Sequence, residues 1–146
     1  MYKRIIIKIG TSILSTNEGR LNVPVMKRLA GEVATLKKKG VEVVLVSSGA
    51  MGAGRGLLKP LVKDETACKQ VLAAVGQVKL MSTYAELFGK HDELCAQVLA
   101  TKEDFRDRTH YLNMRNCFKN LLQSGVIPIV NENDVVATTE LMFTDN

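Results

Sequence analysis

Hydrophobic runs divide the chain into predicted strands of a parallel sheet. They span residues 4–9, 41–46, 94–99 and 126–130. The first is a nearly continuous run of isoleucine, the pattern of a strand covered on both faces. We therefore expect residues 4–9 to form the central strand.

The segments between these runs repeat their apolar residues at helical spacing. Asn22 is a suitable N-cap for a first helix, which Gly40 ends. A second helical pattern covers residues 66–90, where Gly76 predicts a kink or a break into two shorter helices. A further helix over 109–123 completes alternating strands and helices. This order predicts a three-layer α/β/α sandwich with a mainly parallel sheet and right-handed βαβ units.

The end of the chain differs from the rest of this pattern. Residues 138–143 resemble a short edge ribbon, and the chain then stops on a polar turn without a further helix. We expect residues 1–146 to be the N-terminal part of a longer, truncated domain.

Composition favours a soluble globular protein in the cytoplasm. Hydrophobic residues make up 46% and charged residues 24% of the 146 residues, which fits one folded core. No apolar run approaches the ~20 residues that cross a bilayer, and no export signal follows the N-terminus. The net charge of +5 owes much to Lys37, Lys38 and Lys39, which suit the end of a helix. We therefore expect neither a nucleic-acid nor a membrane partner.

The cysteines and histidines show no metal-binding or redox spacing. Cys68, Cys95 and Cys117 lie far apart, as do His91 and His110. No Cys-x-x-Cys pair and no His-Glu-x-x-His motif is present. We expect buried free thiols and assign no residue to a metal.

Polar clusters follow the hydrophobic runs and indicate where chemistry takes place. They are residues 8–12, 47–50 and 131–134. Because the carboxyl ends of parallel strands lie side by side, we expect these clusters to meet in one crevice, the predicted active site.

The first two clusters suit an anion, although each has a structural explanation. Lys8 interrupts an isoleucine strand, so its ammonium either clamps a phosphoryl group or reaches solvent from the strand end. The Gly10 turn offers backbone N–H groups without forming a P-loop. Gly49 begins a Gly-x-x-Gly-x-Gly series, which indicates close packing or a nucleotide. Ser48 lacks the context of an esterase nucleophile and suits hydrogen bonding to a carboxylate.

The third cluster suits a zwitterion. Asn131, Asn133 and Asp134 combine amide donors with a carboxylate, and a buried ammonium needs a carboxylate partner. Turn formation alone also favours these residue types.

Together these segments resemble the glutamate 5-kinase family of the amino-acid kinase superfamily. The resemblance runs along the whole chain and is carried by residues 7–12, 46–50, 54–55, 73–77, 107–108, 112–115, 128–134 and 145–146. Gly10-Thr11-Ser12 distinguishes the chain from aspartokinases and acetylglutamate kinases, which usually carry Gly-Gly-Ser. Thr144 departs from the glycine that is usual in the family before the Asp-Asn pair.

The resemblance implies ATP-dependent phosphorylation of the γ-carboxylate of L-glutamate to L-glutamyl 5-phosphate, the first step of proline biosynthesis. It also implies Mg²⁺ with ATP as cofactor, proline as a feedback inhibitor and a homo-oligomer. The chain would be the glutamate-binding part of the kinase domain, with the ATP-binding half beyond residue 146. As a fragment it should turn over little or not at all.

Site residues follow from the same resemblance, position by position. Lys8 corresponds to the catalytic, phosphate-binding lysine. The positions implied to bind glutamate are Ser48, Asp134 and Asn146, with Asn131 and Asp145 beside them. Those implied to place backbone donors around the phosphoryl group are Gly10, Thr11, Gly49 and Ala50.

Rival functions remain open at this point. Another kinase of the superfamily, acting on aspartate or acetylglutamate, is the nearest alternative. A nucleotide-binding or dinucleotide-binding module without kinase chemistry would explain the glycine-rich turn. A non-catalytic sensor of glutamate or proline would fit a truncated chain.

Overall fold

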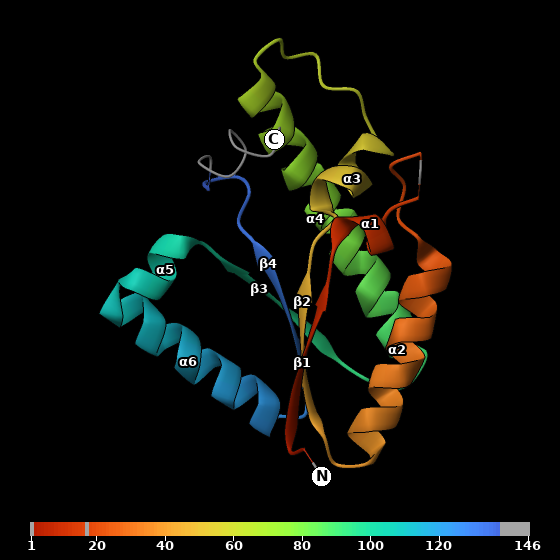
Figure 1. The fold of residues 1–146 in the computed structure, drawn as a ribbon, viewed down its shortest axis with the longest axis vertical. Coiled ribbons are helices and arrows are strands. Elements are labelled where there is room, and N and C mark those ends of the chain that lie inside the picture. The colour runs from red at the N-terminus through yellow and green to blue at the C-terminus, as the bar shows by residue number, and fades with distance from the viewer. Residues whose placement is uncertain (1, 17, 138–146) are drawn as a thin grey trace.

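The computed structural model describes residues 2–16 and 18–137 and shows a four-stranded parallel sheet between helices (Figure 1). The strand order is β1-β2-β4-β3, and all three neighbouring pairs are parallel. The strands are β1 (Arg4–Ile9), β2 (Glu42–Ser47), β3 (Cys95–Ala100) and β4 (Ile127–Glu132).

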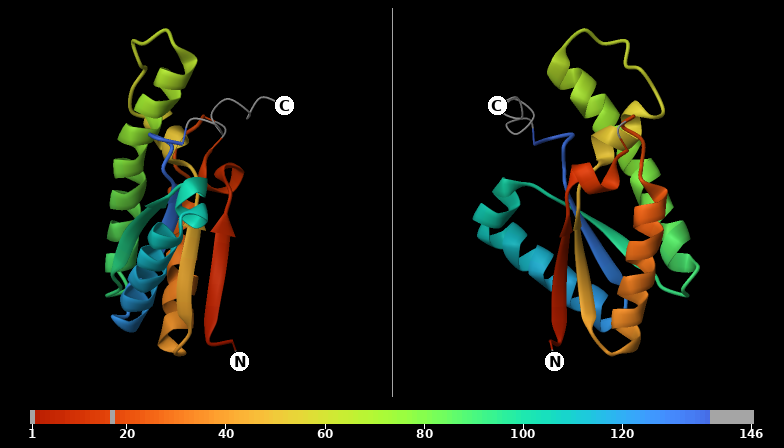
Figure 2. Two further views of the ribbon diagram at one scale, coloured as in Figure 1. Left: turned by 90° about the vertical axis from the view of Figure 1, so that its left-hand side faces the viewer. Right: turned by 45° about the vertical axis from the view of Figure 1, so that its right-hand side comes forward.

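Helices cover both faces of this sheet. They are α1 (Thr11–Leu14), α2 (Val23–Lys38), α3 (Ala50–Arg55), α4 (Glu65–Gly89), α5 (Lys102–Arg106) and α6 (Arg108–Gln123). α2 and α4 pack on one face, whereas α5 and α6 lie on the other (Figures 1 and 2). The predicted α/β/α class with a parallel sheet is confirmed. The structure adds the short helices α1, α3 and α5, which the sequence pattern did not predict.

Local signals in the sequence fix several helix ends, and those at Asn22 and Gly40 were expected. The side chain of Asn22 accepts a hydrogen bond from the backbone N–H of Val25 at 3.4 Å, capping α2. Gly40 and Gly125 adopt φ values of 78° and 71° after α2 and α6, a left-handed conformation that glycine adopts without steric cost. β4 extends to Glu132, so Asn131 lies within the strand and not after it.

The prediction of a broken second helix is wrong, because α4 is continuous for 25 residues. Gly76 serves close packing instead. A Cβ atom at Gly76 would lie 1.7 Å from the carbonyl oxygen of Ala50 in α3. A Cβ atom at Gly54 in α3 would lie 2.1 Å from the carbonyl oxygen of Leu72 in α4. The two glycines therefore let the backbones of α3 and α4 touch where the helices cross.

The main core lies between the sheet and the layer formed by α2 and α4. Its fully buried side chains include Leu14, Met26, Val33, Leu45, Leu80, Tyr84, Phe88, Ile127 and Ile129. The rings of Tyr84 and Phe88 stack with centroids 6.1 Å apart. The Tyr84 hydroxyl lies 3.0 Å from the hydroxyl of Ser47 at the end of β2, so the polar tip of the ring is satisfied inside the core.

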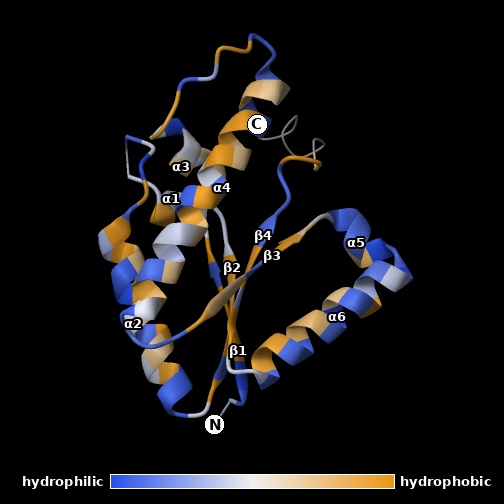
Figure 3. Cartoon of the chain, turned by 180° about the vertical axis from the view of Figure 1, so that it is seen from behind, coloured by the Kyte–Doolittle hydropathy of each residue, from blue (hydrophilic) through white to orange (hydrophobic). Residues whose placement is uncertain are grey.

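β1 is not the central strand of the described sheet but one of its edges. One face of β1 is open: Ile6 is 67% exposed, and Lys8 is exposed on the same face. Figure 3 shows hydrophobic residues along the strands and mixed residues along α6. A cavity of about 470 Å³ between β1 and α6 is lined by Phe105, Tyr111 and Phe118 with Arg4, Arg115 and Lys119, among others.

Two further predictions about side chains need correction. The cysteines are free, but Cys117 is exposed, and Cys68 and Cys95 are half-buried. Lys37 is not simply solvated at a helix end: its ammonium forms an ion pair with Glu93 and donates to the carbonyl of Gly125. None of the helices in the described ranges combines the length and hydrophobicity that a bilayer crossing requires.

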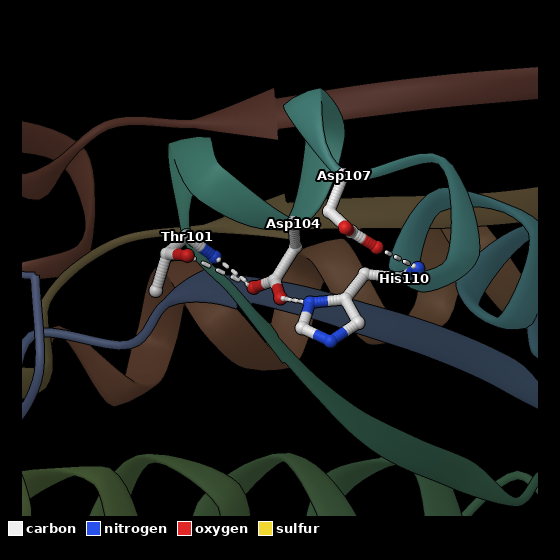
Figure 4. A network of polar contacts seen from close by, with 4 residues as sticks. All are labelled: Thr101, Asp104, Asp107 and His110. Carbon is white, nitrogen blue, oxygen red and sulfur yellow. Dashed lines mark hydrogen bonds and ion pairs between the residues drawn. The ribbon is translucent and has the colours of Figure 1, made fainter.

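The junction of α5 and α6 is held by a network of polar contacts (Figure 4). Asp104 accepts hydrogen bonds from the backbone N–H of Thr101 at 2.7 Å and from its hydroxyl at 3.0 Å. Asp104 also lies 3.0 Å from Nδ1 of His110, while Asp107 accepts from the backbone N–H of His110 at 2.8 Å. The bonds that Asp104 itself makes, chiefly that from the Thr101 N–H, lower its pKa. The network caps both helices and links them through the contact between Asp104 and His110.

Candidate functional site

A cavity of about 280 Å³ opens at the carboxyl ends of the strands. Residues from all three polar clusters line it: Thr11, Ser48, Gly49, Ala50, Asn131, Glu132 and Asp134, with Met51, Gly52 and Arg55 of α3. Part of each predicted cluster therefore meets in this crevice, but Lys8, Gly10 and Ser12 of the first cluster do not line it. The volume lies near the lower end of the range for small-molecule sites, so it suits a small metabolite.

Strand register explains why these residues meet. Ile9 pairs with Ser47, Val46 pairs with Val130, and Leu99 pairs with Asn131. The strands therefore end at nearly the same level of the sheet. Since each loop leaves its strand at that level, Thr11, Ser48 and Asn131 approach one another although the sequence separates them widely.

The turn from β2 into α3 places Ser48 at the cavity wall. Gly49 is the N-cap of α3 and has φ of 95°, which side-chain-bearing residues rarely adopt. This conformation turns the chain from β2 into α3, whose residues Ala50, Met51, Gly52 and Arg55 line the cavity. Ser48 stays half-buried there, while Ala50 and Gly52 are buried against their neighbours.

The turn after β1 brings only part of its cluster to the cavity. Gly10 caps α1, and its carbonyl accepts from the N–H groups of Ile13 and Leu14 at 3.1 and 3.2 Å. Thr11 reaches the wall, but Gly10 and Lys8 are not among the lining residues. Lys8 lies opposite Val46 of β2 on the open face of β1.

Asn131 is the most deeply placed polar residue of the site, with 6% of its surface exposed. Its Nδ2 donates to Oε1 of Gln77 in α4 at 2.9 Å. Its Oδ1 accepts from the backbone N–H of Glu132 at 2.9 Å. Gln77 in turn donates to Oε1 of Gln97 in β3 at 2.8 Å. A chain of amides thus links the site to the helix layer behind it.

Both signs of charge surround the cavity. The carboxylates of Glu132 and Asp134 and the guanidinium of Arg55 are among its lining residues. The arrangement can hold a zwitterion, because an ammonium is attracted to the carboxylates and a carboxylate to the guanidinium and the Ser48 hydroxyl.

Sequence reasoning assigned no role to Arg55 or Gln77, and it placed Glu132 in the third polar cluster without giving its carboxylate a role. Arg55 and Gln77 both lie in segments that carry the family resemblance, which was a usable signal. The predicted glutamate-binding residues Asp145 and Asn146 and the predicted edge ribbon over 138–143 lie outside the described residues. Across residues 2–16 and 18–137, no group of three or more His, Cys, Asp or Glu side chains is arranged to hold a metal ion.

The fold and the site together define an open-sheet α/β protein with a small, polar-lined cavity at the carboxyl ends of its parallel strands. More particularly, the chain belongs to the amino acid kinase family, whose model matches residues 3–146.

Its relatives include proteins named glutamate 5-kinase. The chain is 52% identical to the glutamate 5-kinase of Chlorobaculum tepidum, in an alignment that covers 100% of this chain and 41% of that protein. It is 48% identical to the enzyme of Bacteroides thetaiotaomicron, over 99% of this chain and 41% of the relative. For Caldanaerobacter subterraneus subsp. tengcongensis the identity is 47%, with 98% and 39% covered. The chain thus spans about two fifths of the length of these curated relatives.

Proposed function

We propose that this chain is the glutamate-binding part of a glutamate 5-kinase, a cytoplasmic enzyme that transfers the γ-phosphoryl group of ATP to the γ-carboxylate of L-glutamate. The product is L-glutamyl 5-phosphate, and the reaction begins proline biosynthesis. The observation that carries the proposal is the small cavity that gathers a hydroxyl, an amide, two carboxylates and a guanidinium at the strand ends. Its family and the names of its relatives agree with this reading.

The reaction requires little acid–base catalysis by the protein. A glutamate side chain is ionised at neutral pH, since its ordinary pKa is about 4.3. An oxygen of this carboxylate attacks the γ-phosphorus and ADP leaves, so no general base is needed. The protein must instead align two anions and compensate their charge. The cavity therefore has no need of a catalytic histidine or thiol.

Within this proposal, the carboxylate of Asp134 binds the substrate ammonium, and the Ser48 hydroxyl donates to a substrate carboxylate. Asn131 lines the same cavity, and Asn146 and Asp145 complete the proposed glutamate site. The backbone N–H groups of Gly10, Thr11, Gly49 and Ala50 surround the transferred phosphoryl group. Lys8 supplies positive charge to that group, as lysines do in phosphoryl-transfer sites.

ATP brings Mg²⁺ to the reaction, where the ion neutralises phosphate charge. The described side chains include no cluster that fits a metal ion, so we assign none of them to magnesium. The adenine-binding half lies in the part of the relatives that this chain does not span. Feedback inhibition by proline and assembly into a homo-oligomer belong to the same proposal.

The test is trapping of the acyl phosphate as its hydroxamate, in a polypeptide that begins with this chain and has its relatives' full length. Product should form with L-glutamate, ATP and magnesium, and not with aspartate or acetylglutamate. Lys8→Ala should lower the rate by about 100-fold or more, because phosphoryl charge loses a partner. Asp134→Ala should raise the KM for glutamate by about 10-fold or more.

Lys3→Ala is the matched control, because Lys3 is exposed just before β1, and it should leave the rate unchanged. Product from aspartate or acetylglutamate in preference to glutamate would move the protein to another branch of the family. Glutamate binding without formation of the acyl phosphate would indicate a non-catalytic sensor of glutamate.

A further inference from the structure

Two glutamines of α4 form hydrogen bonds with the two ends of segment 131–135, which carries the cavity carboxylates of Glu132 and Asp134. Gln70 donates from Nε2 to the carbonyl of Val135 at 2.7 Å. Gln77 accepts from Nδ2 of Asn131 at 2.9 Å. Residues seven apart in an α-helix share one face and are separated by about 10 Å along its axis. The segment 131–135 is therefore fastened to one face of α4 at both ends.

Gln77 lies behind the site and not inside it. It is absent from the lining of the 280 Å³ cavity. It lines a separate space of about 20 Å³ beneath the segment, together with Ala50, Asn133 and Asp134. A space of this size holds about one water molecule, so it leaves no room for a substrate beside Gln77.

The amide chain fixes the orientation of Asn131. Asn131 has two N–H groups on Nδ2, and Gln77 takes one of them, which determines where the other points. The Oδ1 atom is held by the backbone N–H of Glu132. Gln77 is itself oriented by its bond to Gln97. Turning the Asn131 amide round would break its bonds to Gln77 and Glu132, and because Asn131 is only 6% exposed, unsatisfied polar atoms there are costly.

We propose that Gln77 is a positioning residue for the kinase reaction. It does not touch the substrate; it holds Asn131, and with Gln70 it holds segment 131–135, so that Asp134 meets the ammonium of glutamate. This inference rests on the proposed function, because it assigns the role of Gln77 to that site.

The first test, in the full-length polypeptide described above, compares Gln77→Leu, which removes the acceptor for Asn131, with Gln77→Glu, which keeps that acceptor and whose second oxygen can accept from the turned amide of the exposed Gln97. We expect Gln77→Leu to lower kcat/KM for glutamate by about 10- to 100-fold, since small misplacements of substrate-positioning groups have effects of this size. The KM for ATP should stay within about 2-fold, and Gln77→Glu should restore most of the loss. Gln123→Leu, an exposed glutamine at the end of α6, is the matched control and should behave as wild type.

A double variant separates positioning from general damage. If Gln77 acts through Asn131, Gln77→Leu should cause no further loss in a protein that already carries Asn131→Leu. An additive loss in the double variant would overturn the proposal, as would failure of Gln77→Glu to restore activity.

A readout that needs no activity keeps this inference separate from the proposed function. The backbone N–H of Glu132 is donated to Asn131 Oδ1, so its hydrogen exchange, followed by NMR, reports the orientation of Asn131. Gln77→Leu should speed this exchange by about 10-fold or more, with exchange in α2 unchanged. Unchanged exchange at Glu132, or equal acceleration throughout the protein, would refute the positioning role. Absence of kinase activity in the wild type would instead refute the proposed function.

Discussion

Tyr84 shows how a single polar atom is accommodated in the core of this protein. Its ring is fully buried and stacks on Phe88, and its hydroxyl lies 3.0 Å from that of Ser47. Burial raises the pKa of Tyr84, with the bond to Ser47 opposing that effect. The phenol is therefore held in its neutral form beside the end of β2.

We expect Tyr84→Phe to lower the free energy of unfolding by about 1–2 kcal/mol at neutral pH, because the buried bond between the two hydroxyls is lost and Ser47 keeps only its bond to the carbonyl of Ser48. Because the pKa is raised in the folded state, the contribution of Tyr84 is full below about pH 10 and is lost as the pH rises further. Urea unfolding at a series of pH values should show a steeper alkaline loss in the wild type than in Tyr84→Phe. Tyr111→Phe is the control, because Tyr111 is 45% exposed; equal pH profiles for wild type and Tyr84→Phe would contradict the assignment.

At this scale, sequence reasoning succeeds where the cause is local. The cap at Asn22 and the left-handed turns at Gly40 and Gly125 depend on residues a few positions away, so the pattern contains them. The bond between Ser47 and Tyr84 spans 37 positions and that between Gln77 and Asn131 spans 54. Contacts between residues so far apart produce no periodic pattern in the sequence, so sequence reasoning could not predict them.

At the scale of the helices, the crossing of α3 and α4 shows tertiary packing overriding the low helix propensity of glycine. Glycine inside a helix costs about 1 kcal/mol relative to alanine, which is why Gly76 predicted a break. The structure keeps α4 continuous, because the close approach of Ala50 and Gly54 requires a residue without Cβ. The sequence alone reveals the low helix propensity of this glycine, but it does not reveal the contact with α3 that offsets this cost.

Gly76→Ala should therefore destabilise the protein by about 3 kcal/mol or more, since the new methyl group meets backbone that has no room to move. Gly89→Ala is the matched control at the end of the same helix: nothing lies within 4 Å of its added Cβ. It should be neutral or stabilising by up to about 1 kcal/mol. Thermal unfolding of the two variants provides the comparison. Similar unfolding midpoints would contradict the close backbone contact between α3 and α4 at Gly76.

At the scale of the whole molecule, a largely buried ion pair ties several elements together at the amino ends of the strands, opposite the cavity. Lys37 at the end of α2 meets Glu93, which precedes β3, and the carbonyl of Gly125, which precedes β4. The side chains of Lys37 and Glu93 are 15% and 16% exposed. The contact therefore joins the α2 layer to the α6 layer across the ends of the strands.

Lys37→Met should lower the free energy of unfolding by about 2 kcal/mol, because it leaves the Glu93 carboxylate largely buried without its partner. The loss is less than for a completely buried pair, since both groups retain some contact with water. Lys38→Met, an exposed neighbour, should change stability by less than about 0.5 kcal/mol. Urea unfolding measures both, and a Lys37→Met variant as stable as wild type would contradict this role.

The class of the fold and the meeting of the three clusters were predictable, because parallel strands dictate where their carboxyl ends lie. The place of β1 was not. Its isoleucines indicate burial on both faces, yet Ile6 is 67% exposed and β1 is an edge within the described residues. A run of hydrophobic residues indicates that both faces of a strand are buried, but it does not show which segment of the polypeptide covers each face.

The interlocked glycines also determine how this molecule can move. Because the backbones of α3 and α4 touch at Gly54 and Gly76, neither helix can slide or roll without collision. The two must travel as one rigid body, and α3 forms part of the cavity wall. Any movement that admits a ligand must therefore keep this pair of helices intact.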